Sequence, residues 1–133
     1  MIPKFRFFGK VNDGTERMVM ADSIDFENGF IYYSYHDYTV EGDDHVYGDV
    51  IGFEDCVLMQ STGVFDKNGK EIFEGDVVKI FGEKLSKIYY SDGAFCVDIL
   101  IGGTPLHAFL SEQLEIIGNI HRNPELMEEV LND

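Results

Sequence analysis

Apolar and polar residues alternate over short stretches along most of the chain. Residues 4–7, Lys-Phe-Arg-Phe, alternate with the period of a half-buried strand. Further strands are expected where β-branched and aromatic residues gather, at residues 17–21, 30–35, 56–60, 76–81, 87–90, 94–101 and 114–120. Turns rich in Asn, Asp and Gly separate several of them, at residues 12–14, 27–29, 66–70 and 91–93. The polar stretch 36–49 is expected to form a loop.

The C-terminal end follows a different pattern. Asn123 can cap a helix, Pro124 suits its first position, and Glu125 complements the positive end of the helix dipole. Leu126 and Val130 then follow at helical spacing. We therefore predict a short helix over residues 124–132. Because a helix of about nine residues is marginal in isolation, it is expected to pack on the body or to frame a partner site.

Many short strands with regular turns and one helix indicate a mainly β fold. The expected architecture is a set of small barrel or sandwich-like lobes of antiparallel strands, in a single domain of 133 residues. Two packed lobes are an option within that domain, with residues 1–60 in the first, residues 61–122 in the second, and the terminal helix over 123–133. A hydrophobic content of 44%, with 11 Phe and 7 Tyr, supplies enough apolar material for a core.

Targeting signals and cysteine usage point to a cytoplasmic protein. Residues 1–10 contain no uninterrupted apolar run of seven or more, which disfavours a secretory signal. No stretch approaches the roughly 20 apolar residues of a membrane-spanning helix. Cys56 and Cys96 both lie in apolar, strand-like runs and are expected to be free thiols that serve as small packing residues.

The net charge of −15 is the strongest compositional signal. Residues 36–66 contain eight acidic residues and no Lys or Arg, whereas residues 67–90 contain five basic and four acidic residues. Such a charge opposes nonspecific binding to nucleic acid, because that affinity comes largely from neutralising phosphates. It favours solubility and attraction to basic partners.

Sequence motifs for catalysis are absent. There is no GxGxxG, P-loop, HExxH or GxSxG pattern. A calcium loop at residues 66–77 fails because glycine stands at the fourth position and Val77 at the twelfth. His36 and His45 flank acidic residues, but without a defined ligand spacing a solvated acidic loop explains them better than a metal site. No catalytic residue, metal or cofactor is predicted.

Two further groups of side chains have structural and functional interpretations. The tyrosines at 32, 33, 35 and 38 could stack nucleobases, but the negative charge around them favours a core or cross-strand ladder. His107 lies in an apolar run and is interpreted as a structural residue, and His121 as a surface residue.

Three segments resemble the YopX family of phage and prophage proteins. They are residues 4–6 with the segment around Met18 and Val19, residues 58–78, and residues 116–126. Their order and spacing are similar to the family pattern over most of the chain, and the departures lie in the acidic loop and in residues 79–105. The resemblance implies an origin in a mobile element and supplies no reaction. Gly75 and Asp76 also resemble the start of the first strand in SH3-like barrels, which implies an SH3-like C-terminal lobe by analogy.

Three functional hypotheses follow. The first is a non-enzymatic acidic module that binds a host or phage protein, in a sharper form by mimicking nucleic acid; its candidate binding residues are Asp37, Glu41, Asp43, Asp44 and Asp49. The second is a nucleic-acid-binding small barrel that uses Lys67, Lys70, Lys79, Lys84 and Lys87, which the overall charge opposes. The third is a metal-dependent enzyme, which only the acidic loop supports. Self-association through exposed edge strands is a further option.

Overall fold

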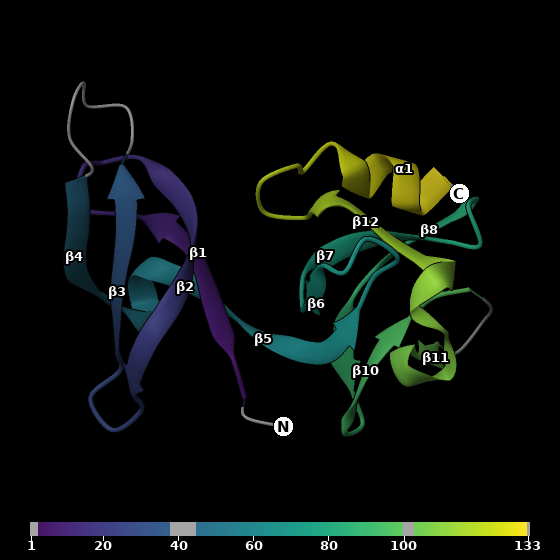
Figure 1. Cartoon of the computed structure of the whole chain (residues 1–133), viewed down its shortest axis with the longest axis horizontal. Coiled ribbons are helices and arrows are strands. Elements are labelled where there is room, and N and C mark those ends of the chain that lie inside the picture. The colour runs from purple at the N-terminus through teal and green to yellow at the C-terminus, as the bar shows by residue number, and fades with distance from the viewer. Residues whose placement is uncertain (1–2, 38–44, 100–102, 133) are drawn as a thin grey trace. The chain divides into compact units, whose positions relative to one another are not determined.

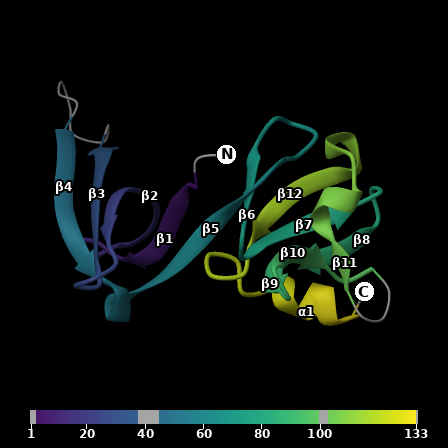
Figure 2. The same ribbon diagram turned by 90° about the horizontal axis from the view of Figure 1, so that it is seen from below.

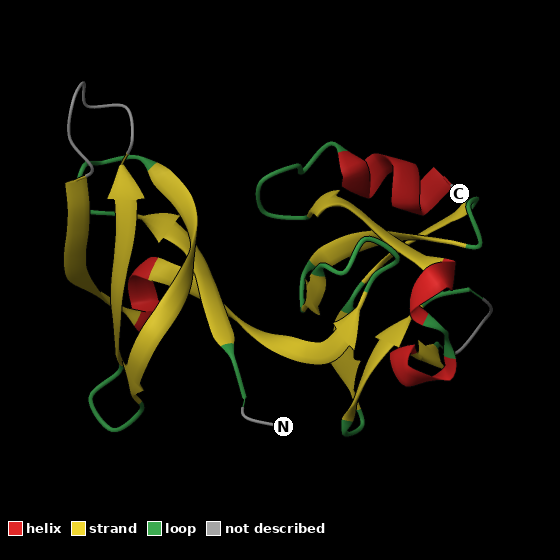
Figure 3. Ribbon diagram, viewed as in Figure 1, coloured by secondary structure: helices red, strands yellow, loops and turns green. Residues whose placement is uncertain are grey.

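The computed structural model describes residues 3–37, 45–99 and 103–132, and within them the protein is mainly β. It contains three antiparallel sheets of six, three and three strands and one short helix at the C-terminal end (Figure 1, Figure 3). The chain divides into two compact units, an N-terminal unit of residues Lys4–Met59 and a C-terminal unit that begins at Gln60. The prediction of a mainly β fold with a C-terminal helix is confirmed.

The N-terminal unit is built from consecutive antiparallel strands. These are β1 (Phe5–Lys10), β2 (Glu16–Asp25), β3 (Phe30–Asp37) and β4 (His45–Gly52), and each pairs with the next. One face of the strands is apolar, so the registers bring Phe7 opposite Val19 and Ile31 opposite Ile51. The core of this unit consists of Phe7, Val11, Val19, Ile31, Tyr33 and Ile51.

The hairpin of β3 and β4 corrects the expectation of a loop over residues 36–49. β3 extends to Asp37 and β4 begins at His45, with an unbroken register from Phe30 opposite Gly52 to Asp37 opposite His45. Val46, Tyr47, Val50 and Ile51 are residue types that favour strands. Acidic residues around them are typical of a loop, but at the edge of a sheet an acidic side chain such as Asp49 stays exposed to solvent within a strand.

The C-terminal unit contains two small sheets. One has the order β12–β7–β8, and the other has the order β11–β10–β9. The strand bounds are β7 (Asp76–Ile80), β8 (Lys84–Lys87), β9 (Tyr89–Ser91), β10 (Ala94–Val97), β11 (Thr104–Pro105) and β12 (Leu114–Asn119). Two strands differ from the prediction. The strand predicted over residues 87–90 is interrupted at the buried Ile88, and the strand that starts at Ala94 ends at Val97.

Single-turn 3-10 helices and a shared strand complete the fold. The 3-10 helices cover Phe53–Asp55, Leu106–Ala108 and Ser111–Gln113. β5 (Cys56–Phe65) follows β1 in the six-stranded sheet and pairs with β6 (Glu71–Phe73). Every sheet in the described residues has two edges, so none of them closes into the barrel that the short strands suggested.

Two of the segments that carry the family resemblance meet at the Asp66 turn. The Asp66 side chain is buried, and its Oδ1 accepts hydrogen bonds from the backbone N–H groups of Asn68 and Lys70, both at 2.9 Å. Its Oδ2 accepts a hydrogen bond from the Ile116 N–H on β12, at 3.0 Å. One carboxylate therefore fixes the predicted turn and ties it to a strand fifty residues further along the chain.

A second buried polar link joins the same segments at β7 and β12. Asp76 Oδ2 accepts the Phe73 N–H at 2.8 Å, and its Oδ1 accepts Asn119 Nδ2 at 3.3 Å. Asn123 Oδ1 accepts the Asn119 N–H at 3.1 Å. The Asn123 side chain thus binds β12 instead of capping the terminal helix.

The terminal helix α1 (Leu126–Asn132) begins two residues later than predicted. Its first backbone contact is the Leu126 N–H, which donates to the Asn123 carbonyl at 3.0 Å. Within the described part of the chain, no helix has the length and apolar character that a membrane span requires.

Replacing Gly118 with alanine should loosen the attachment of α1 to β12. A Cβ atom at Gly118 would lie 2.5 Å from Leu126 Cδ1 and 2.8 Å from Asn123 Oδ1, and Asn123 cannot move without losing its bond to Asn119. We expect a loss of about 1–3 kcal/mol in the free energy of unfolding, measured by urea denaturation. Gly48→Ala is the control, because its Cβ would meet only the Tyr33 carbonyl, at 3.6 Å. Equal stability of the Gly118→Ala variant and wild type would contradict this packing.

Candidate functional site

The N-terminal unit has an open groove of about 560 Å³ between the end of β1 and the edge strand β4. Its lining residues are Lys10, Val11, Asn12, Phe30, Tyr33, Asp49, Val50, Ile51, Gly52 and Asp55. The volume falls within the range of small-ligand pockets, but the groove is open and lies along a strand. Such a shape suits an extended chain better than an enclosed small molecule.

Tyr33 is an uncharged aromatic residue in the lining of the groove. The side chain is only 4% exposed, and its ring packs edge-on against Phe7 with 5.1 Å between the ring centroids. Burial raises the pKa of the Tyr33 hydroxyl, and the charges of Asp49 and Asp13 add to that rise, against a backbone hydrogen bond from Asn12 that lowers it. The hydroxyl therefore keeps its proton at neutral pH.

Asp49 and Asp55 place two exposed carboxylates at the groove. Asp49 lies directly opposite Tyr33 in the β3–β4 register, and its Oδ1 accepts a hydrogen bond from the Val50 N–H at 2.8 Å. Asp55 approaches Gly52 closely, since a Cβ there would lie 3.4 Å from Asp55 Oδ2. Lys10 is the single basic side chain among the lining residues. The groove consequently favours cationic groups.

The structure relates the predicted acidic binding residues to the groove in different ways. Asp49 lies in the groove. Asp37 ends β3 and pairs in register with His45, and its side chain is not described. Glu41, Asp43 and Asp44 lie outside the described residues. The sequence therefore pointed to one residue of the groove through its charge.

The other groove residues escaped sequence reasoning. The sequence indicates a core or ladder role for Tyr33 and gives no signal for a site at Lys10 or Asn12. Tyr33 belongs to an alternating run, and the alternation places it on the buried face of β3, but nothing in the sequence shows that this residue lines a groove. Asp55 belongs to the acidic segment 36–66, and the sequence assigns it no binding role.

A smaller cavity of about 210 Å³ lies in the C-terminal unit. Its lining residues are Thr62, Val64, Gly93, Ala94, Phe95, Leu106 and His107. His107 is exposed at this cavity, which corrects its interpretation as a structural residue of an apolar run. The cavity is below the usual size of a ligand pocket, and its lining contains no Asp, Glu, Lys or Arg, so the groove is the better candidate.

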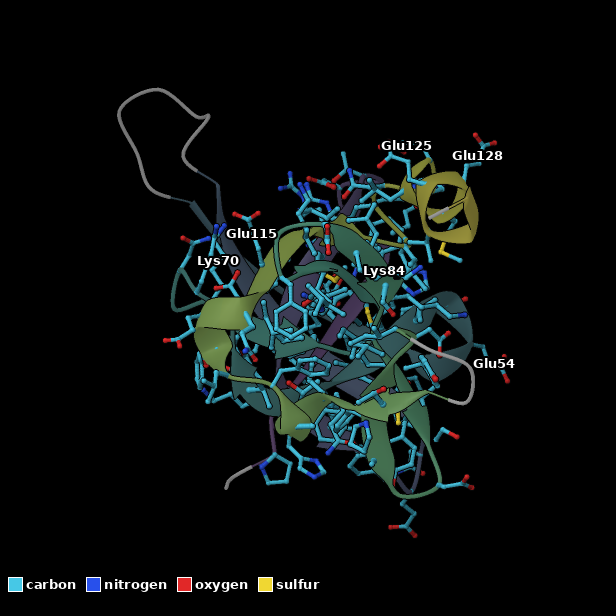
Figure 4. The ribbon with its side chains drawn as sticks, turned by 90° about the vertical axis from the view of Figure 1, so that its right-hand side faces the viewer. Glu54, Lys70, Lys84, Glu115, Glu125 and Glu128 are labelled. Atoms are coloured by element: carbon cyan, nitrogen blue, oxygen red, sulfur yellow. The ribbon has the colours of Figure 1, made fainter. Side chains whose placement is uncertain are left out.

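The lysines of the C-terminal unit are interspersed with acidic side chains. Lys67 Nζ forms an ion pair with Glu115 Oε2 at 3.1 Å. Figure 4 labels Lys70 and Lys84 together with Glu115, Glu125 and Glu128 on this unit. Among the described residues, this unit therefore presents mixed charge, which favours binding to phosphates less than a continuous basic stripe does.

The environment of Cys56 favours the protonated thiol over the thiolate. Burial raises the pKa of the Cys56 thiol, and the Asp55 charge raises it further. The Cys56 Sγ instead donates a weak hydrogen bond to the Gly52 carbonyl at 3.5 Å. Both cysteines are free thiols. Across residues 3–37, 45–99 and 103–132, no three His, Cys, Asp or Glu side chains gather closely enough to hold a metal ion.

Two comparisons with known proteins find matches over most of the chain. The family model of the YopX protein matches residues 4–128. The fold is similar to the crystal structure of protein EF1440 from Enterococcus faecalis, with a TM-score of 0.65 and 30% sequence identity over 96% of this chain and 99% of that one. No curated protein matches the sequence. Because the family model covers nearly the whole chain, this protein belongs to the YopX family.

Proposed function

We propose that this protein is a non-enzymatic interaction module whose acidic N-terminal unit binds a basic segment of a phage or host protein. The observation that carries the proposal is the groove, whose lining brings together Asp49, Asp55 and the uncharged side chain of Tyr33. The charge of the whole unit supports it, because residues 4–59 contain twelve acidic and four basic residues. This field attracts cationic partners over distances comparable to the Debye length.

The C-terminal unit serves as a scaffold in this proposal. Gly75 has a φ of 89° and turns the chain into β7 through Asp76, as in the first strand of SH3-like lobes. We extend the proposal to an SH3-like arrangement of this unit, in an open form because its described sheets do not close. The two free thiols suit a reducing compartment, and we assign the module to the cytoplasm.

Neutralising the groove carboxylates should weaken binding to a cationic peptide. The probe is a short acetylated peptide in which lysine and valine alternate, followed by fluorescence anisotropy at low salt. For the variant Asp49→Asn/Asp55→Asn we expect an affinity about 5- to 30-fold lower, because each exposed ion pair contributes up to about 1 kcal/mol. Raised salt should weaken binding by the wild type more than binding by the variant.

The control for this experiment is Glu83→Gln/Asp92→Asn, which removes the same charge from exposed positions of the C-terminal unit. We expect it to bind the peptide within about twofold of wild type, because screening limits the effect of distant charges. Equal losses in the two variants would reduce the effect to net charge and contradict a site at the groove. Absence of binding to the wild type would overturn the proposal.

A further inference from the structure

The edge strand β4 has backbone groups that face away from the sheet. It lies at one end of the six-stranded order and pairs with β3 alone among the described residues (Figure 1, Figure 2). The Phe53 N–H donates to the Gly29 carbonyl at 2.9 Å, just beyond the end of the β3–β4 register. In an antiparallel ladder, hydrogen-bonded residue pairs alternate with pairs that are not hydrogen-bonded. The unbroken register therefore directs the backbone groups of Asp49 and Ile51 toward β3 and those of Gly48 and Val50 toward the open side.

This edge lacks several of the features that usually block an open strand, although the charged Asp49 on its inner face is one such feature. β4 contains no lysine, proline or bulge. Gly48 and Gly52 flank Val50 on the outer face, so no side chain beside Val50 obstructs an approaching chain. Among the described residues, the Asp49 carboxylate protects this edge by accepting the Val50 N–H. A carboxylate can leave this position when a cation attracts it.

The two faces beside the edge differ in chemistry. On the outer face, Val50 stands opposite Tyr32, and both side chains are more than 40% exposed. On the inner face, Asp49 stands opposite Tyr33, and the groove continues to Asp55. Because side chains of an added strand alternate between the faces, its apolar residues would meet Val50 and its basic residues would meet the two carboxylates.

We propose that the open edge of β4 pairs with an extended segment of a basic protein in which lysine or arginine alternates with apolar residues. This inference rests on the proposed function and specifies how its partner is recognised. On binding, the Asp49 carboxylate leaves the Val50 N–H for a cation of the partner, and a backbone carbonyl of the partner accepts that N–H. A second copy of this chain is a poor occupant, because a net charge of −15 and the same carboxylates would face each other.

The decisive variants change one backbone donor. Val50→Pro removes an N–H that does not pair with β3, and proline is tolerated at such positions of edge strands. Val50→Thr keeps the N–H and serves as its matched control. We expect Val50→Pro to bind the alternating lysine–valine peptide about 10-fold more weakly than Val50→Thr. A peptide with proline in place of valine has the same charge but cannot pair as a strand, and it should bind wild type about 10-fold more weakly.

Hydrogen exchange gives a test that needs no variant. In the wild-type complex with the alternating peptide, the amide hydrogens of Gly48 and Val50 should exchange at least about 10-fold more slowly than in the unbound protein. This measurement also decides the question if Val50→Pro fails to fold.

The outcomes separate the two proposals. If the alternating peptide binds, but Val50→Pro, the proline peptide and amide exchange show no difference, strand pairing is wrong and electrostatic binding at the groove stands. If the wild type binds no alternating peptide, both proposals are overturned. Slower amide exchange at Gly48 and Val50, together with a lower peptide affinity of the Val50→Pro variant, supports both proposals.

Discussion

Replacing Phe7 with alanine should lower the free energy of unfolding by about 3–5 kcal/mol, the usual result when a buried phenylalanine is truncated. The Phe7 side chain is 0% exposed and belongs to the core of the N-terminal unit. Its ring also packs edge-on against the ring of Tyr33 in the groove lining. The Phe7→Ala variant should therefore also bind the lysine–valine peptide more weakly than wild type. Urea denaturation followed by circular dichroism measures the first effect, and anisotropy measures the second.

Phe26→Ala is the matched control for Phe7. The Phe26 ring belongs to the same unit but is 64% exposed, and it touches Phe5 and Phe53 only at ring edges, with 6.0 Å between centroids in each pair. Such contacts contribute about 0.5–1.5 kcal/mol each, and exposure reduces that further. If both phenylalanine variants lost the same stability, the assignment of Phe7 to the core would be contradicted.

Replacing Asp66 with asparagine should destabilise the protein by about 2–4 kcal/mol. Asparagine has one carbonyl oxygen, whereas the Asp66 carboxylate uses both oxygens to accept three backbone N–H groups. An amide that keeps the turn would direct its NH₂ group at the Ile116 N–H, and a buried donor left without an acceptor costs about 1–3 kcal/mol. Urea denaturation at neutral pH measures the loss.

Glu83→Gln removes the same charge at an exposed position and is the control for Asp66. We expect a change within about 0.5 kcal/mol for it. Equal effects of the two substitutions would show that net charge, and not the buried hydrogen bonds, explains the result.

The contribution of Asp66 should also depend on pH. Burial alone would raise the pKa of Asp66, but the hydrogen bonds from Ile116, Lys70 and Asn68 and the Lys70 charge outweigh it, and the pKa is lowered. Its stabilising contribution is therefore complete above the unfolded pKa of about 4 and is lost as pH falls through the lower folded pKa. The stability difference between wild type and Asp66→Asn should shrink on acidification below about pH 4; a constant difference would contradict this linkage.

Residues that act locally made much of the fold predictable. Alternation placed strands near residues 5–7, 30–35 and 76–80, and Asp66 with Gly69 marked a turn that the structure contains. The terminal helix was predicted from spacing and was displaced by two residues. The displacement has a tertiary cause, because the Asn123 side chain binds the Asn119 N–H on β12 instead of the helix.

The candidate site was less accessible to sequence reasoning. The charge of Asp49 marks it as a candidate in the sequence, but the acidic residues around it predict a loop and not the strand β4. Its identity as a strand depends on pairing with β3, and the position of Asp49 opposite Tyr33 depends on the register of that hairpin. A shift of one residue would move Asp49 to the other face.

The sequence by itself determined the mainly β character, the main turns, the C-terminal helix and the membership of the YopX family. The first three depend on backbone preferences and periodicity within a few residues, whereas the family membership rests on the match of the sequence over residues 4–128. Only the tertiary structure decided that the sheets are open, that β4 forms an edge, and that the Asp49 carboxylate covers the Val50 N–H on it. Edges and registers arise from pairing between segments that are separate in the chain, and the local pattern of residues does not specify those partners.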